Sequence, residues 1–283
     1  MPLVSVDDLA RRLHDAALRL ADVRWTLARP GGGRADYLAG HVPGAVFVDL
    51  DADLSAPPGP GRHPLPDPVE FAGRLQALGF GSDHSIVVYD DAGGTVAARL
   101  WWMLDALGHP WVAVLDGGIG AWTAAGLPLE TGTRAHAPAR LSLGDRWPRT
   151  VDREALRARL GRVTLLDARA PERYRGEIEP IDPVPGHIPT ALSLPVTGNL
   201  GPDGRLLPPA DLAARFRAVG VSGDPGAPQV IVSCGSGVYA CQHALAMRVA
   251  GLPDPTLYAG SYSDWTRAGL PVATGPGPGE PPG

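Results

Sequence analysis

The chain has 283 residues, of which 44% are hydrophobic and 19% charged, and its net charge is −5. This composition fits two globular domains and argues against a nucleic acid or an anionic membrane as the main partner. No apolar run approaches the ~20 residues that span a bilayer. The N-terminal sequence MPLVSVDDLARRL lacks the basic and apolar segments of a signal peptide. We therefore expect a cytoplasmic protein.

The residue types exclude several chemistries. The basic residues are all arginines, so Schiff-base formation and a P-loop lysine are excluded. The two cysteines, Cys234 and Cys241, are too few for a disulfide framework or a thiolate zinc site. We expect no metal and no cofactor, and at least one of the two cysteines is a candidate reactive thiol.

Two short apolar segments rich in β-branched residues predict buried parallel strands, at residues 85–90 (SIVVYD) and 228–234 (PQVIVSC). Each is followed by a turn and an Ala- and Leu-rich stretch that predicts a helix, over residues 97–108 and 240–251. The glycine that closes each stretch is typical of a helix C-cap. Strand, turn and helix in this order predict α/β domains, each a mostly parallel sheet flanked by helices.

Several segments occur twice in the chain. GHVPGA at residues 40–45 is matched by GHIPTA at 186–191, and residues 115–132 match residues 258–275 at a constant offset. The matching segments are separated by about the length of a domain, far more than the period of a short solenoid repeat, which indicates two copies of a whole domain. We expect an N-terminal domain at 1–131, a linker at 132–149, a C-terminal domain at 150–274 and a disordered tail at 275–283.

Cys234 ends the second predicted strand and begins the loop CGSGVYA, which leads into a helix. Gly235 and Gly237 let the backbone of such a loop curl, so that several N–H groups face one point above the helix N-terminus. Partial positive charge at this point favours a thiolate and, after sulfur transfer, a persulfide anion. The alternative is that Cys234 is a small buried core residue.

Taken together, the CGSGVYA loop, the paired GHVP and GHIP segments, the stretch DARAPERYRGE from Asp167 and the repeated GLP endings resemble the tandem rhodanese family. The resemblance covers nearly the whole chain. It implies two tandem rhodanese-like domains and sulfur transfer through a persulfide on Cys234. It also implies that the N-terminal domain lacks the catalytic cysteine, because Asp90 or Asp91 stands at that position. The substrate-binding residues that it implies are Arg173, Gly235, Gly237, Val238, Tyr239 and Ala240.

The loop sequence distinguishes two branches of that family. Gly235-Ser236-Gly237 is similar to the 3-mercaptopyruvate branch, whereas the thiosulfate branch typically has a basic pair after the cysteine. By this similarity, Ser236, His63 and Asp51 form a relay that delivers a proton to the pyruvate enolate left after sulfur transfer. Taken alone, His63 in its Pro- and Gly-rich loop is typical of a solvent-exposed residue, and Asp51 of a turn cap.

Other positions depart from the family pattern. Thr190 replaces a glycine, and Tyr239 replaces a threonine. Residues 177–187 contain no arginine where the mercaptopyruvate branch has a second ligand for the carboxylate. The loop therefore favours 3-mercaptopyruvate as the donor, the missing arginine argues against it, and thiosulfate stays open. His41 and His187 recur in both copies and are interpreted as structural.

The partners implied are a small-molecule sulfur donor, a cyanide or thiol acceptor and a thioredoxin-like reductant. An alternative function is a protein sulfur-relay module that receives persulfide sulfur from a partner protein. A cysteine phosphatase requires C-x5-R, but Ala240 stands at the arginine position. Cys241, inside the predicted helix, is interpreted as a packing residue or a resolving thiol.

Overall fold

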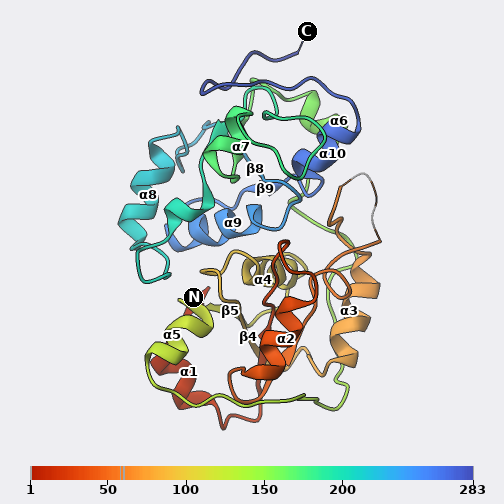
Figure 1. The fold of residues 1–283 in the computed structure, drawn as a ribbon, viewed down its shortest axis with the longest axis vertical. Coiled ribbons are helices and arrows are strands. Elements are labelled where there is room, and N and C mark those ends of the chain that lie inside the picture. The colour runs from red at the N-terminus through yellow and green to blue at the C-terminus, as the bar shows by residue number, and fades with distance from the viewer. Residues whose placement is uncertain (1, 58, 60, 283) are drawn as a thin grey trace. The chain divides into compact units, whose positions relative to one another are not determined.

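The computed structural model describes residues 2–57, 59 and 61–282. The chain divides into two compact units, whose elements are drawn in Figure 1. The first unit contains Met1–Ala56, Pro66–Pro148 and Leu200–Leu206. The second unit contains Pro57–Leu65, Arg149–Asn199 and Leu207–Gly283. Each unit therefore includes one short segment that is distant in sequence from the rest of it, and the segment in the second unit carries His63.

The first unit is built on a parallel sheet with the strand order β1-β5-β4-β2-β3. Its strands are β1 (Leu3–Val4), β2 (Leu18–Asp22), β3 (Ala45–Phe47), β4 (Ser85–Tyr89) and β5 (Val112–Leu115). Its helices are α1 (Val6–Arg12), α2 (Gly32–Ala39), α3 (Pro68–Ala77), α4 (Ala97–Ala106) and α5 (Gly118–Ala124). Local sequence explains two helix starts, because the side chains of Ser5 and Asp67 accept hydrogen bonds from backbone N–H groups of α1 and α3.

The second unit is built on a parallel sheet with the strand order β7-β6-β8-β9. Its strands are β6 (Thr164–Asp167), β7 (Leu192–Ser193), β8 (Val230–Ser233) and β9 (Thr256–Leu257). Its helices are α6 (Arg153–Arg157), α7 (Pro171–Arg175), the 3-10 helix η1 (Val196–Asn199), α8 (Pro209–Arg217), α9 (Ala240–Val249) and α10 (Ser261–Arg267). Figure 1 shows α8 and α9 on one side of this sheet and α6 and α10 on the other.

The central strands of the second unit are buried on both faces. Leu165 of β6 and Ile231 of β8 pack in one hydrophobic core with Leu156 of α6 and Trp265 of α10. Leu166, the next residue of β6, is also buried and points to the opposite face, as successive side chains of a strand do. Strands buried on both faces are typical of parallel sheets covered by helices. The predicted α/β class with parallel sheets is confirmed.

The elements predicted around the two equivalent loops are also confirmed. β4 and β8 lie within the predicted strand segments, and α4 and α9 begin at the predicted residues. Gly108 and Gly251 follow these helices with φ of +87° and +70°, the left-handed conformation that glycine adopts readily. Short-range sequence signals were sufficient for these elements.

Two segments expected to be irregular make defined contacts. The segment predicted as a linker lies within the first unit up to Pro148, where the indole N–H of Trp147 donates to the Pro66 carbonyl oxygen at 2.7 Å. In the predicted tail, the N–H of Gly275 donates to the carbonyl oxygen of Arg175 at 2.9 Å. Among the residues that the structure describes, no helix combines the length and the hydropathy needed to cross a bilayer.

Candidate active site

Cys234 directly follows β8 and opens the loop to α9. It is buried, with 3% of its surface exposed. Its backbone N–H donates to Ser261 Oγ at 3.1 Å, and its carbonyl oxygen accepts the N–H of Tyr262 at 3.0 Å. These two contacts hold the cysteine against the start of α10. Since β8 lies between β6 and β9, Cys234 stands at the carboxyl end of an interior strand. That end of a parallel sheet is where α/β domains place their ligands.

The loop holds the sulfur of Cys234 through its own backbone. The N–H of Gly237 donates to Sγ at 3.1 Å. Gly237 has a φ of +79°, and a Cβ there would lie 2.3 Å from the Ala259 carbonyl oxygen, so the position requires glycine. The thiol of Cys241 donates to the carbonyl oxygen of Gly237 at 3.3 Å. Cys241 on α9 therefore stabilises the loop through this hydrogen bond.

The other loop residues expected to bind substrate differ in exposure. Gly235, Val238 and Ala240 are buried. Tyr239, the residue that departs from the family pattern, is 37% exposed and immediately precedes α9. Its phenol therefore does not fill the interior of the loop.

Ser236 and His63 are brought together by the fold. His63 Nδ1 lies 2.8 Å from Ser236 Oγ, a hydrogen-bond distance. Both residues are buried, with 7% and 8% of their surfaces exposed. Asp51 belongs to the first unit, where its carboxylate accepts the indole N–H of Trp25 at 3.0 Å. The serine and the histidine thus share one unit, and the part of Asp51 in the relay stays a prediction.

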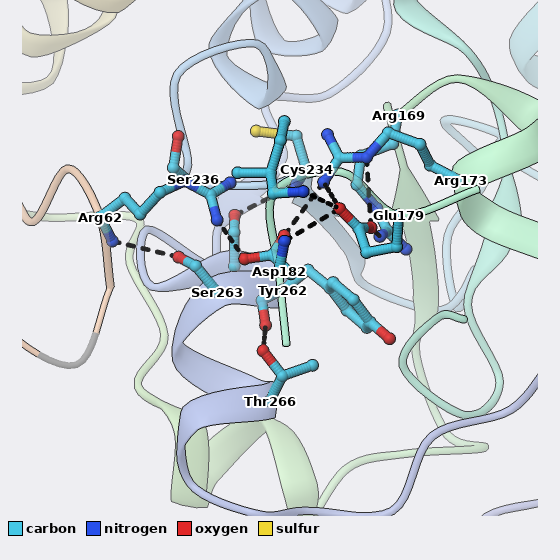
Figure 2. Close-up of polar contacts among 12 residues, drawn as sticks. Arg62, Arg169, Arg173, Glu179, Asp182, Cys234, Ser236, Tyr262, Ser263 and Thr266 are labelled. Carbon is cyan, nitrogen blue, oxygen red and sulfur yellow. Dashed lines mark hydrogen bonds and ion pairs between the residues drawn. The ribbon is translucent and has the colours of Figure 1, made fainter. Parts of the chain in front are cut away.

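Arg173 lies on α7 and points to the loop, but two carboxylates already bind it. Its Nη2 lies 2.7 Å from Glu179 Oε1 and 3.0 Å from Asp182 Oδ2. Both carboxylates come from the segment after α7, residues 177–187, which contains no arginine. The guanidinium expected to bind the donor's anionic end is therefore ion-paired within the unit, as Figure 2 shows.

Arg62 provides a second guanidinium beside the loop. It forms an ion pair with the other carboxylate oxygen of Asp182. A Cβ added to Gly235 would lie 2.7 Å from Arg62 Nη2 and 3.6 Å from Arg173 Nη1. Both guanidinium groups therefore lie close to Gly235, the residue that follows Cys234.

A third arginine completes this charged cluster. Nη2 of Arg169 lies 2.7 Å from Asp167 Oδ2, and its guanidinium lies 3.8 Å from the centre of the Tyr262 ring. Burial opposes the charge of Arg169, but the neighbouring groups, of which the Asp167 carboxylate contributes most, together outweigh burial and raise the pKa of Arg169. Burial also raises the pKa of Tyr262, so its hydroxyl stays protonated at neutral pH.

A family of rhodanese-like domains matches residues 5–125 and 152–268. The chain belongs to the rhodanese family. A probable 3-mercaptopyruvate sulfurtransferase of Pseudomonas aeruginosa is 48% identical over 280 residues, which cover 96% of this chain and 98% of that protein. A putative thiosulfate sulfurtransferase of Mycobacterium tuberculosis is 42% identical, with 93% of each chain covered. The structure of a 3-mercaptopyruvate sulfurtransferase from Leishmania major matches with a TM-score of 0.82 and 31% identity, covering 93% of this chain and 74% of that one.

The first rhodanese domain has Asp90 at the position of Cys234. The residue before Asp90 pairs with the last residue of β2, as the residue before Cys234 pairs with the last residue of β6. Asp90, and not Asp91, is therefore the structural equivalent. Its carboxylate accepts hydrogen bonds at 2.8–2.9 Å from the backbone N–H groups of Ala92, Gly94, Val96 and Ala97.

Sequence reasoning missed Arg62, Glu179 and Asp182. Arg62 directly precedes the candidate residue His63, but nothing in the local sequence indicates that Arg62 belongs to the site. Its ion pair with Asp182 joins residues 120 positions apart. Such a contact depends on how distant segments pack in the second compact unit and has no signal in the spacing of residues.

Proposed function

We propose that this rhodanese is a sulfurtransferase that takes sulfur from 3-mercaptopyruvate and carries it as a persulfide on Cys234. Its relative from Pseudomonas aeruginosa, named as a probable 3-mercaptopyruvate sulfurtransferase, is similar over nearly the full length of both chains. The observation that carries the choice of donor is the 2.8 Å contact between His63 Nδ1 and Ser236 Oγ.

In the first half-reaction, the thiolate of Cys234 attacks the sulfur of mercaptopyruvate. A sulfur–sulfur bond forms, the carbon–sulfur bond of the donor breaks, and its electron pair stays on carbon as pyruvate enolate. The N–H of Gly237, 3.1 Å from Sγ, stabilises negative charge on the cysteine sulfur. Cys234 is left as a persulfide.

The enolate must gain a proton to leave as pyruvate, and the thiol of the donor must lose one. The pair formed by Ser236 and His63 supports both transfers, since an imidazole can accept the thiol proton and return it to the enolate carbon. Both side chains are buried, so bulk water is a poor proton source there. When thiosulfate is the donor, the leaving group is sulfite, and no carbon has to be protonated. The proton transfer by Ser236 and His63 is therefore needed with mercaptopyruvate and not with thiosulfate.

In the second half-reaction, the terminal sulfur of the persulfide passes to cyanide or to a thiolate, and the thiolate of Cys234 is regenerated. Thiocyanate or a new persulfide is the product. We propose a small thiol or a thioredoxin-like reductant as the acceptor in the cell. The chain has only two cysteines, too few for the disulfide framework typical of secreted proteins, and we therefore assign the enzyme to the cytoplasm.

Thiocyanate formation from cyanide tests this function, with kcat/KM compared for 3-mercaptopyruvate and thiosulfate. Cys234→Ser is the blank, and Cys241→Ser is the control for loss of the other thiol. We expect a preference for mercaptopyruvate that depends on Cys234. A preference for thiosulfate would contradict the choice of donor. Absence of Cys234-dependent turnover with either donor would instead favour a protein sulfur-relay module.

A further inference from the structure

Two guanidinium groups converge beside Cys234 from different segments of the second compact unit. Arg173 comes from α7, and Arg62 comes from the segment that also carries His63. The backbone N–H of Arg62 donates to Ser263 Oγ at 3.1 Å, which fixes this segment against α10. The side chains of Arg62 and Arg173 are 15% and 16% exposed, so both cations are largely buried.

The cluster around these cations is neutral in sum. It contains the arginines Arg62, Arg169 and Arg173 and the carboxylates Asp167, Glu179 and Asp182. Uncompensated buried cations are costly, and two adjacent ones also repel each other. The carboxylate of Asp182 prevents this by contacting both Arg62 and Arg173, as Figure 2 shows.

We propose that Arg62 and Arg173 together bind the anionic end of the sulfur donor, and that Asp182 occupies this site until the donor displaces it. The inference rests on the proposed function, because it names the residues that hold the donor of that reaction. It also explains how the site can bind a carboxylate although residues 177–187 contain no arginine. The second guanidinium comes from Arg62 instead.

The carboxylates of the cluster differ in how firmly they are held. Oε1 of Glu179 accepts the backbone N–H groups of Ile181 and Asp182 at 3.1 and 3.0 Å, in addition to binding arginine. Among the described residues, the carboxylate of Asp182 contacts the two arginines alone. A donor carboxylate can replace those contacts one for one, since both are planar anions that accept from guanidinium.

The segment that carries Asp182 is weakly packed on its outer side. Ile178 and Ile181 are 57% and 36% exposed, so few apolar contacts hold this part of the chain in place. Displacement of Asp182 therefore does not require the hydrophobic core to open. We therefore expect Asp182 to lower the affinity for the donor, because its carboxylate competes for the arginines. We expect Arg62 to raise this affinity, because its guanidinium binds the donor.

The test is steady-state kinetics with 3-mercaptopyruvate and cyanide on full-length variants. Arg62→Ala should raise KM about 10-fold or more, because it removes a charge-assisted contact to the donor, with a smaller change in kcat. Asp182→Asn should lower KM by roughly 3-fold or more, because it removes the competing anion. Arg175→Ala is the matched control: Arg175 also lies on α7 and pairs with Glu177 at 2.7 Å, away from Cys234.

A second readout separates donor binding from damage to the fold. Each variant can be converted to its Cys234 persulfide with an excess of donor, which is then removed. The transfer of the persulfide sulfur to cyanide is followed in a single turnover. This step involves no donor carboxylate, so Arg62→Ala should transfer at a rate close to that of the parent enzyme. If that variant is poorly folded, Arg62→Gln takes its place.

Each outcome decides the proposal. A KM for Arg62→Ala equal to that of Arg175→Ala would overturn the role of Arg62. An unchanged or raised KM for Asp182→Asn would overturn the role of Asp182 as a stand-in for the donor. These failures differ from failure of the proposed function, in which the parent enzyme itself would show no Cys234-dependent turnover with mercaptopyruvate.

Discussion

The loop after β4 and the loop after β8 lie at equivalent places in the two rhodanese domains, yet they hold different side chains. In the first domain, the carboxylate of Asp90 accepts N–H groups from along its loop and from the first turn of α4. In the second domain, the N–H of Gly237 donates to the sulfur of Cys234. In both domains, backbone N–H groups of the strand–loop–helix turn donate to the side chain that follows the strand. In the first domain the acceptor is the carboxylate of Asp90, and in the second it is the sulfur of Cys234.

The surroundings of the two loops differ as much as the loops do. Tyr37 stacks on His41 in the first domain as Tyr174 stacks on His187 in the second. This equivalence places Asp36, which pairs with Arg29, at the position of Arg173. The first domain therefore lacks the cation as well as the thiol.

The largest expected effect is the loss of turnover on replacing Cys234 with serine, because a serine oxygen cannot carry transferable sulfur. Adding Asp90→Cys to this variant should not restore turnover, since the first domain lacks an equivalent of Arg173. Thiocyanate formation measures this, and the melting transition of the double variant shows whether its first domain is folded. Restored turnover would mean that the loop alone is sufficient for activity.

Removal of the proton relay should have the next largest effect. His63→Ala and Ser236→Ala should each lower kcat with 3-mercaptopyruvate by roughly 10²- to 10⁴-fold, the usual contribution of a positioned acid–base group. Turnover with thiosulfate should fall much less, because sulfite leaves without protonation at carbon. Equal losses with both donors would remove the relay from the mechanism.

The site shows which parts of the structure sequence alone could predict. The strands, the helices and the place of Cys234 follow from apolar runs, glycine caps and one loop motif, all of which are local. The approach of His63 to Ser236 was reached only through resemblance to a family, since His63 lies in a loop without periodicity. The ion pair of Arg62 with Asp182 was not predicted, because it depends on how distant segments pack.

A third prediction concerns acid sensitivity. His243 of α9 stands where Leu100 stands in α4, and burial lowers its pKa to about 4. Unfolded histidine has a pKa near ~6.5, so between these values the unfolded chain binds a proton that the folded chain does not. Stability of the second domain should therefore fall by about 3 kcal/mol as the pH drops from 7 to 4.

The variant His243→Leu makes this position the same in both domains. It should flatten the pH dependence of the melting temperature below pH 6.5, even though it also loses the 2.7 Å contact of His243 with the carbonyl oxygen of Leu194. An equally steep dependence in the variant would assign the acid sensitivity to other groups.

The smallest expected effect concerns the turn after the repeated segments GHVP and GHIP. Gly44 has a φ of +86°, and its equivalent Thr190 has a φ of +70°. A left-handed conformation costs a residue with a Cβ roughly 1–2 kcal/mol, of which glycine recovers part. Thr190→Gly should therefore stabilise the second domain by about 1 kcal/mol in urea unfolding. The reciprocal Gly44→Thr should destabilise the first domain, and a destabilising Thr190→Gly would contradict this account.

The most direct test of the central claim is mass spectrometry of the enzyme after incubation with 3-mercaptopyruvate and removal of free donor. We predict the added mass of one sulfur atom on the peptide that contains Cys234, one equivalent of pyruvate released, and loss of the added mass on treatment with cyanide. An unmodified Cys234 peptide together with released pyruvate would contradict a persulfide at this residue.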